Sequence, residues 1–196
     1  MADIIFLTGG SGFLGSHILI QLLERGYHVR AAVREKKAAH FKQGYERFKD
    51  QLEVVAIADI ATDQFPDALK GVKAVIHTAA PISGRVNDAE SLLKGAVEGL
   101  LNVIHQAEKA GITSVVVTST ILTAATSAMT FTDKDWHQTT KEAALQTEGV
   151  SAYSAAKTLA EKEVWDFAEA HPYIEITTSM SRSVPLREFY PLPASD

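Results

Sequence analysis

Short apolar runs alternate with longer segments of helical period along this chain. Runs typical of buried strands cover residues 4–7, 29–33, 52–57, 74–77, 114–118 and 174–178. Segments with apolar residues three or four positions apart, typical of amphipathic helices, cover residues 13–23, 35–48, 89–110 and 152–169. This alternation predicts βαβ units around a parallel sheet. We therefore predict an α/β fold, a Rossmann-type doubly wound parallel sheet with helices on both faces.

Two segments depart from this pattern. Residues 123–149 are polar and irregular, with a weak helical stretch at 142–146. Residues 179–196 scatter Ser, Arg and Pro without a period, and we predict that they are poorly ordered. A doubly wound fold normally continues at this point into another helix and strand. The chain therefore divides into a nucleotide-binding domain, residues 1–178, and an irregular tail, residues 179–196.

Composition narrows the class of protein. A length of 196 residues, with 46% hydrophobic and 22% charged residues, fits one globular domain. The net charge of -5 argues against nucleic acid as a partner. The absence of Cys excludes disulfides and thiolate chemistry, and the seven His lack metal-ligand spacing, so we expect no metal. Neither a signal peptide nor a membrane-length apolar run is visible, so we expect a cytoplasmic protein without membrane contact.

A glycine-rich turn follows the first predicted strand directly. Its glycines have G-x-x-G-x-x-G spacing and open the first helix, where free N–H groups face an anion. The turn predicts dinucleotide binding, and the alternative is a tight turn that uses glycine for conformation only. The expected binding residues are Thr8, Gly9, Gly12, Phe13, Leu14 and Gly15.

The end of the second predicted strand indicates which dinucleotide binds. NAD-preferring proteins often place an acid there, whereas this chain has Val33 followed by Arg34, with Lys36 and Lys37 close behind. A guanidinium can make the paired hydrogen bonds that a 2'-phosphate accepts. We therefore expect NADP(H) to be preferred, with NAD(H) possible because Glu35 weakens the basic character. Asp59 and Ile60, just past the third strand, are expected near the adenine, although Asp59 is equally well explained as a turn residue.

Tyr153 and Lys157 form the candidate catalytic pair. They lie four residues apart on the helix predicted at 152–169, hence on one face. A neighbouring ammonium stabilises a phenolate, so Lys157 would lower the pKa of Tyr153 and could hold ribose hydroxyls. Thr120 follows the fifth strand, at the sheet edge where ligands bind, and could hydrogen-bond a carbonyl oxygen, with Ser119 as the alternative.

Several segments resemble one known family. They are TGGSGFLGSH at 8–17, VRAAVR at 29–34, VIHTAAP at 75–81, VVVTST at 115–120, FTDKDW at 131–136 and YSAAKTLAEK at 153–162. The chain resembles the extended short-chain dehydrogenases/reductases, specifically dihydroflavonol reductases, cinnamoyl-CoA reductases and fungal aldehyde/ketone reductases. The resemblance implies NADPH-dependent reduction of a small-molecule aldehyde or ketone, with Tyr153 as acid/base, Lys157 as its partner and Thr120, more often Ser in the family, as third member. It also implies that Ala79 and Ala80 lie beside the cofactor.

The resemblance ends after Thr178. Members of the family continue with over a hundred residues that shape the substrate pocket, so we expect this substrate-binding part to be missing. Two other functions stay open: an NAD-dependent nucleotide-sugar epimerase or dehydratase, and a catalytically inactive nucleotide-binding protein. The helix at 89–110 could pair with a second copy, so a monomer and a homodimer are both compatible with the sequence.

Overall fold

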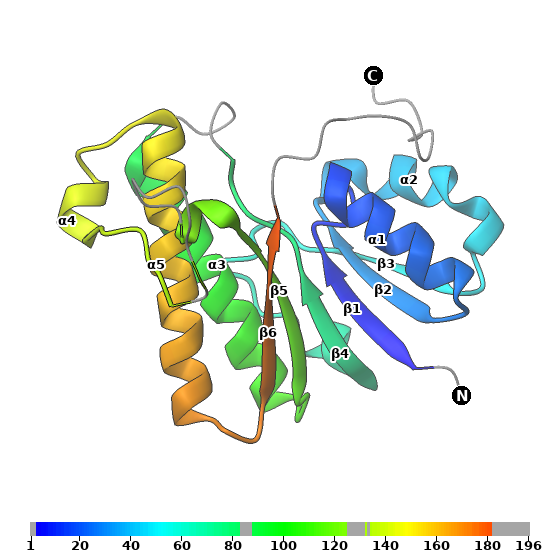
Figure 1. The fold of residues 1–196 in the computed structure, drawn as a ribbon. Helices are drawn as coiled ribbons and strands as arrows, with labels where there is room; N and C mark the ends of the chain where they lie inside the picture. Colours follow the sequence, from blue (N-terminus) through cyan, green and yellow to red (C-terminus); the bar gives the residue numbers. More distant parts are fainter. Residues whose placement is uncertain (1–2, 83–87, 125–131, 133, 182–196) are drawn as a thin grey trace.

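A parallel six-stranded sheet forms the centre of the molecule (Figure 1). The computed structural model describes residues 3–82, 88–124, 132 and 134–181. The strand order is β3-β2-β1-β4-β5-β6, and every neighbouring pair is parallel. The strands are β1 (Ile4–Thr8), β2 (His28–Val33), β3 (Leu52–Ala56), β4 (Val72–His77), β5 (Ser114–Thr120) and β6 (Glu175–Ser181). This order confirms the predicted Rossmann-type sheet.

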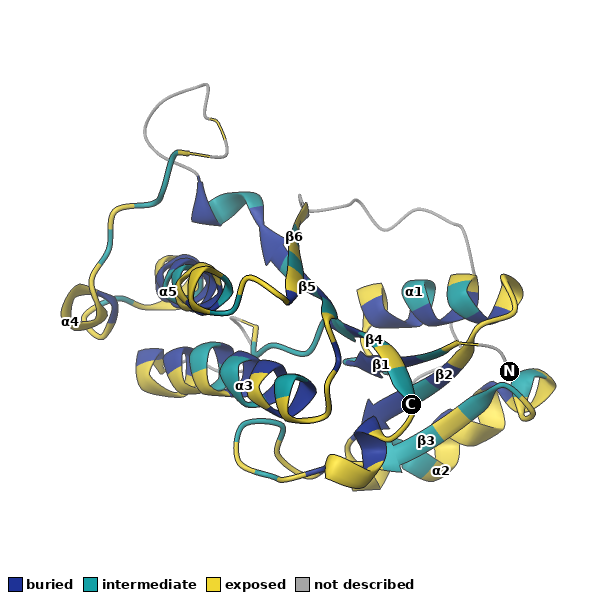
Figure 2. Ribbon diagram, turned by 90° about the horizontal axis from the view of Figure 1, so that it is seen from below, coloured by how far each residue is buried: buried dark blue, intermediate teal, exposed yellow. Residues whose placement is uncertain are grey.

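Helices pack on both faces of this sheet. Helices α1 (Phe13–Glu24) and α2 (Glu35–Gly44) share one apolar cluster with β1 and β2. On the other face, α3 (Ala89–Lys109) and α5 (Gly149–Ala170) share a larger cluster with β1, β4 and β5. Figure 2 shows these helices buried on the side toward the sheet and exposed on the other. The short helices are η1 (Glu46–Phe48), η2 (Pro66–Leu69), η3 (Ile121–Thr123) and α4 (Lys141–Ala144).

Several element boundaries differ from the prediction. The helix expected at 35–48 ends at Gly44 and is followed by the separate turn η1. The strand expected at 174–178 begins at Glu175 and continues to Ser181, three residues past the predicted domain boundary. Thr178 to Ser181 pair in register with Val117 to Thr120 of β5, so backbone hydrogen bonds extend a strand whose side chains carry no apolar pattern. Residues 182–196, the rest of the predicted tail, lie outside the described residues.

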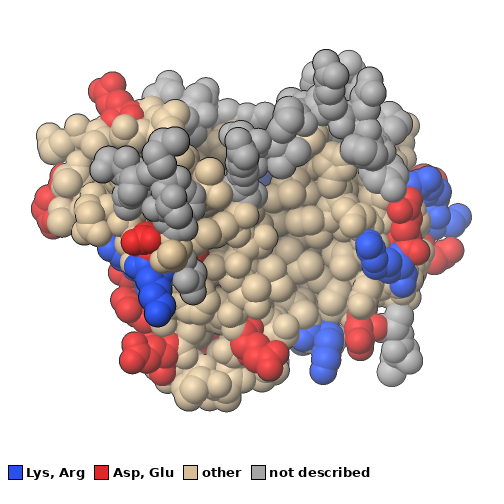
Figure 3. Space-filling model, viewed as in Figure 1, with Lys and Arg blue, Asp and Glu red and all other residues tan. Residues whose placement is uncertain are grey.

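The sheet is covered unevenly. No described helix covers β5 and β6 on the face that carries α1 and α2, and there Thr177 and Ser179 are exposed (Figure 1). Figure 3 shows the Lys, Arg, Asp and Glu side chains of this view at its margins, around an uncharged middle. Doubly wound sheets are ordinarily covered on both faces, so this region lacks a layer in the described part. None of the helices in the described ranges is long and apolar enough to cross a membrane.

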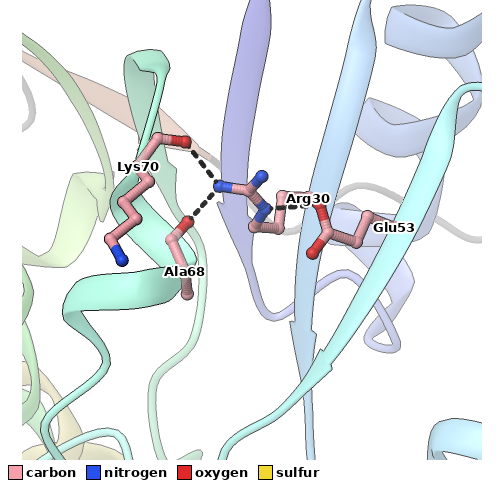
Figure 4. Close-up of polar contacts among 4 residues, drawn as sticks. All are labelled: Arg30, Glu53, Ala68 and Lys70. Atoms are coloured by element: carbon pink, nitrogen blue, oxygen red, sulfur yellow. Dashed lines mark hydrogen bonds and ion pairs between the residues drawn. The ribbon is translucent and has the colours of Figure 1, made fainter.

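Arg30 of β2 fastens the η2 segment to the amino-terminal half of the sheet (Figure 4). Its Nη1 donates to the backbone oxygens of Ala68 (2.8 Å) and Lys70 (2.9 Å). Its Nε donates to Glu53 Oε2 at 2.7 Å. The Arg30 side chain is 11% exposed and the Glu53 side chain 61% exposed. The contact with Ala68 is partly buried, whereas those with Lys70 and Glu53 are exposed.

Replacing Arg30 is therefore expected to destabilise the fold more than replacing Glu53. In Arg30→Met the free energy of unfolding should fall by about 1–3 kcal/mol, because two carbonyl oxygens lose their donor. Glu53→Gln should cost less than about 1 kcal/mol, as is usual for exposed ion pairs. Urea unfolding of the two variants beside wild type gives both values. Equal losses would mean that the contacts of Arg30 with the two carbonyl oxygens add nothing to stability beyond the ion pair with Glu53.

Candidate active site

The glycine turn is built around contacts that admit no side chain. At Gly9, where φ is 73°, a Cβ would lie 2.4 Å from Thr78 Oγ1. At Gly15 a Cβ would lie 2.1 Å from the backbone oxygen of Gly9. That same oxygen accepts a hydrogen bond from the Gly12 N–H at 2.9 Å. The turn thus holds the start of α1 tightly against the end of β1.

The first turn of α1 has free donors at the sheet edge. Gly12 is the N-cap residue, has no side-chain capping bond, and is followed by no acidic residue in the first turn. The first N–H groups of a helix have no partner inside the helix, and they carry the positive end of its dipole. Gly12, Phe13 and Leu14 are exposed beside them, although Phe13 and Leu14 are large and apolar. This arrangement fits the diphosphate of a dinucleotide.

The residues expected at the adenine end lie beyond β2 and β3. Arg34 is the exposed N-cap residue of α2, and its guanidinium makes no hydrogen bond or ion pair with the described residues. Lys37 is half-buried one turn later. Asp59 Oδ1 accepts a hydrogen bond from the Ala61 N–H at 2.9 Å, so the turn role considered for Asp59 is present. Ile60 is half-buried against α3, where its Cγ2 would meet a Cβ at Gly99.

Polar contacts join the ends of β1 and β4, where the strand order reverses. Thr8 Oγ1 shares a hydrogen bond with His77 Nδ1 at 2.9 Å. The same hydroxyl accepts from the backbone N–H groups of Thr78 (3.2 Å) and Ala79 (3.3 Å). Ala79 and Ala80 are half-buried after β4. Ligands of doubly wound sheets bind at this reversal point, so the loop beside the cofactor is expected here.

The candidate catalytic residues come from β5 and α5, next along the same sheet edge. Thr120 ends β5, is buried, and its Oγ1 accepts from the Leu122 N–H at 3.3 Å. Lys157 is buried, and its Nζ donates to the backbone oxygen of Thr118 at 2.8 Å. Tyr153 is half-buried one turn earlier on α5, and its hydroxyl makes no hydrogen bond with the described residues. The Ser154 hydroxyl donates to Leu122 O at 3.0 Å and holds this turn of α5 against η3.

Burial dominates the electrostatics of this group. It raises the pKa of Tyr153, in the direction opposite to the lowering expected from a neighbouring ammonium. It lowers the pKa of Lys157, and the charge of Glu161 opposes this effect. Burial, followed by the charge of Lys157, lowers the pKa of His77 to about 3, with a hydrogen bond at Ala79 acting the other way. At neutral pH the phenol is therefore protonated and the imidazole uncharged.

Two buried polar residues beside Lys157 were not among the predicted site residues. Glu161 lies one turn after Lys157 on α5, and its Oε2 accepts a hydrogen bond from the Ser119 hydroxyl. The sequence names Ser119 only as a substitute for Thr120, yet alternation along β5 turns it toward α5. A charged residue on the inward face of an amphipathic helix was the available signal for Glu161. No group of three or more His, Asp or Glu that could hold a metal occurs in the described ranges.

The comparison with family models assigns the chain. The model of the NAD dependent epimerase/dehydratase family matches residues 5–184, which include the glycine turn, Thr120, Tyr153 and Lys157. The chain belongs to this family. The segment that matches the family model begins in β1 and ends just after β6, so it covers nearly all of the described fold.

Named relatives in this family are NADPH-dependent and other reductases. The NADPH-dependent methylglyoxal reductase of Saccharomyces cerevisiae is 32% identical over 84% of this chain and 52% of its own length. Dihydroflavonol 4-reductase of Arabidopsis thaliana is 33% identical over 85% of this chain and 46% of its own. The crystal structure of yeast methylglyoxal/isovaleraldehyde reductase with NADPH superposes with a TM-score of 0.80 at 27% identity, over 90% of this chain and 56% of that one. The chain thus spans about half the length of the curated relatives that it matches.

Proposed function

We propose that the chain is the coenzyme-binding half of an NADPH-dependent carbonyl reductase, which reduces an aldehyde or ketone to an alcohol. One observation carries the proposal. The glycine turn with the free N–H groups of α1 and the group of Thr120, Tyr153 and Lys157 lie at the same carboxyl edge of one parallel sheet. The reductases among the relatives support the class of reaction.

Each part of this edge has a role in holding NADPH. The N–H groups at the start of α1 bind the diphosphate, and Arg34 binds the 2'-phosphate through paired hydrogen bonds. Lys157 donates to the ribose hydroxyls beside the nicotinamide. The Thr8 hydroxyl accepts from the Ala79 N–H and so holds Ala79 at the end of β4, beside β1. When bound, the reduced nicotinamide supplies the hydride that reaches the carbonyl carbon.

The protein's own contribution to the reaction is proton transfer. Thr120 donates a hydrogen bond to the substrate oxygen and orients it toward α5. Tyr153 then gives its phenolic proton to that oxygen as the alkoxide forms. Burial favours this role, because the raised pKa of Tyr153 keeps the phenol protonated at neutral pH. The charge on Lys157 stabilises the phenolate left behind until it is protonated again.

Calorimetric titration with NADPH and NADH tests the coenzyme assignment. Wild type should bind NADPH more tightly than NADH, and Arg34→Ser should weaken NADPH binding by about 10–100-fold, because charge-assisted hydrogen bonds to the 2'-phosphate are lost. The affinity of the Arg34→Ser variant for NADH should equal that of wild type. Lys42→Ser, which removes an exposed cation from the far end of α2, is the matched control and should bind both coenzymes like wild type.

The outcomes separate the alternatives. No binding of either coenzyme would overturn the proposal as a whole. Tighter binding of NADH would instead support an NAD-dependent epimerase or dehydratase. Binding of NADPH without its oxidation, over a panel of aldehydes and ketones, would indicate a nucleotide-binding protein without reductase activity.

A further inference from the structure

A buried pair of opposite charges lies beneath the candidate active site. Lys157 is 7% exposed and Glu161 is 3% exposed, and both belong to the inward face of α5. They are four residues apart, which places them on neighbouring turns of one helix face. Charged residues are rarely buried this far unless their charge is compensated. The proposed reaction uses Lys157 and gives no role to Glu161.

Two consecutive residues of β5 hold this pair. The backbone oxygen of Thr118 accepts from Lys157 Nζ at 2.8 Å. The hydroxyl of Ser119 donates to Glu161 Oε2. The other carboxylate oxygen, Oε1, is buried and has no hydrogen-bond partner among the described residues. Glu161 therefore has one fixed oxygen and one oxygen whose charge is uncompensated by hydrogen bonding in that part of the chain.

Few titratable groups lie around Lys157 in the part of the chain that the structure describes. Glu161 on α5 opposes the lowering of the Lys157 pKa that burial causes. His77 on β4 interacts with the charge of Lys157, but its pKa of about 3 leaves it neutral at physiological pH. Tyr153, one turn earlier on α5, is also neutral there because burial raises its pKa. Among these neighbours Glu161 is thus the group that supplies negative charge.

We propose that Glu161 is a positioning residue of the active site, whose buried carboxylate is the counter-charge that holds Lys157 as an ammonium at the end of β5. This inference rests on the proposed function for its catalytic consequence, since Lys157 serves the reaction only while it carries charge. The contact with Ser119 fixes the carboxylate on the strand that also holds the ammonium. Glu161 itself touches neither substrate nor coenzyme.

Lysine labelled with 13C at Cε tests the charge pair directly by NMR. The Cε shift of Lys157, assigned by its loss in Lys157→Arg, is followed against pH in wild type, Glu161→Gln and Glu163→Gln. Glu163 is exposed on the same helix, so its variant removes the same charge without touching the buried site. The titration midpoint of Lys157 should move to lower pH in Glu161→Gln alone. Midpoints that agree in all three proteins, within about 0.2 pH units, would overturn the proposal.

A second measurement on wild type covers the case in which Glu161→Gln does not fold. The 13Cδ shift of Glu161 shows whether its carboxyl group is ionised at pH 7. An ionised carboxylate supports the pair, and a protonated one overturns it. Both titrations are made without coenzyme, so they decide the inference even if wild type fails to bind NADPH.

Coenzyme binding gives the functional readout. NADPH affinity should fall with rising pH in Glu161→Gln, by roughly 3–10-fold between pH 7 and 9, as Lys157 loses its charge. Wild type and Glu163→Gln should change less over this interval. An identical pH dependence in the three proteins would contradict the role of Glu161.

Discussion

Replacing Tyr153 by Phe is expected to lower kcat for carbonyl reduction by about 10²–10⁴-fold, the usual contribution of a positioned general acid. The substitution removes one oxygen that makes no hydrogen bond with the described residues, so neither folding nor coenzyme affinity should change appreciably. The measurement is NADPH oxidation with the aldehyde or ketone that wild type reduces best, together with a binding titration of NADPH.

The matched control is Tyr173→Phe. Tyr173 is exposed near the start of β6, and its hydroxyl donates to Glu108 at 2.6 Å, far from the carboxyl edge of the sheet. This variant should turn over like wild type. Equal turnover in wild type and Tyr153→Phe would remove the phenol from the mechanism. A loss of NADPH affinity in Tyr153→Phe, with kcat unchanged, would assign Tyr153 to binding instead.

The pH dependence of kcat in the same reaction is an independent test of Tyr153 as proton donor. As proton donor, Tyr153 acts in its protonated form, so kcat should fall as pH rises through the pKa of the phenol in the enzyme–substrate complex. Burial raises the pKa of Tyr153, which keeps the donor protonated to higher pH. The charge of Lys157 acts in the opposite direction, because a neighbouring ammonium favours the phenolate and so lowers the pKa of the phenol. The position of the alkaline limb therefore reports which effect is larger.

The sheet could be predicted from the sequence because its strands are short, apolar and separated by amphipathic helices. The strand at residues 4–7 and the glycine turn after it locate the centre of a doubly wound fold, and βαβ handedness leaves little freedom for the rest. The error at β6 has a different origin. Ser179 and Met180 are recruited into the strand by pairing with Thr118 and Ser119, and such pairing leaves no period in the sequence.

The candidate site was partly accessible to the same reasoning. The spacing in the sequence was sufficient to name four candidates, because each spacing has a chemical reason. They are Gly9, Gly15, Tyr153 and Lys157. The role proposed for Glu161 depends on its burial, and this burial depends on how α5 packs against β5. A carboxylate four residues after a lysine is ordinarily interpreted as an exposed helical pair.

The sequence predicted a lowered pKa for Tyr153, and the upward shift escaped this reasoning for the same cause. The sequence places an ammonium one turn away, but in the structure burial of the Tyr153 side chain raises its pKa. Desolvation is a property of the folded environment and cannot be obtained from spacing. The opposing effect of Glu161 on Lys157 likewise became visible only once both side chains were placed on one buried helix face.

Replacing Gly15 by Ala is expected to cost the fold about 3 kcal/mol of unfolding free energy, at the upper end of the usual overpacking range. The added Cβ would lie 2.1 Å from the Gly9 backbone oxygen and 2.7 Å from the Gly9 carbonyl carbon. These are backbone atoms of the glycine turn, so relief requires α1 to move away from β1. In a helix alanine is ordinarily more favourable than glycine by about 1 kcal/mol. A loss of stability in Gly15→Ala would therefore be opposite in sign to the effect of helix propensity.

Gly10→Ala is the matched control for this change in the same turn. Its Cβ would have ordinary contacts, the nearest at 3.4 Å with Leu7 Cδ2, and its cost should stay below about 1 kcal/mol. Urea unfolding measures the free energy of unfolding of both variants. NADPH titration of the folded fraction measures their coenzyme affinity. Because the same displacement of α1 moves its free N–H groups, Gly15→Ala should lose coenzyme affinity along with stability. Stability equal to that of Gly10→Ala would mean that the turn adapts to a side chain, and that close packing of α1 on β1 does not shape the diphosphate site.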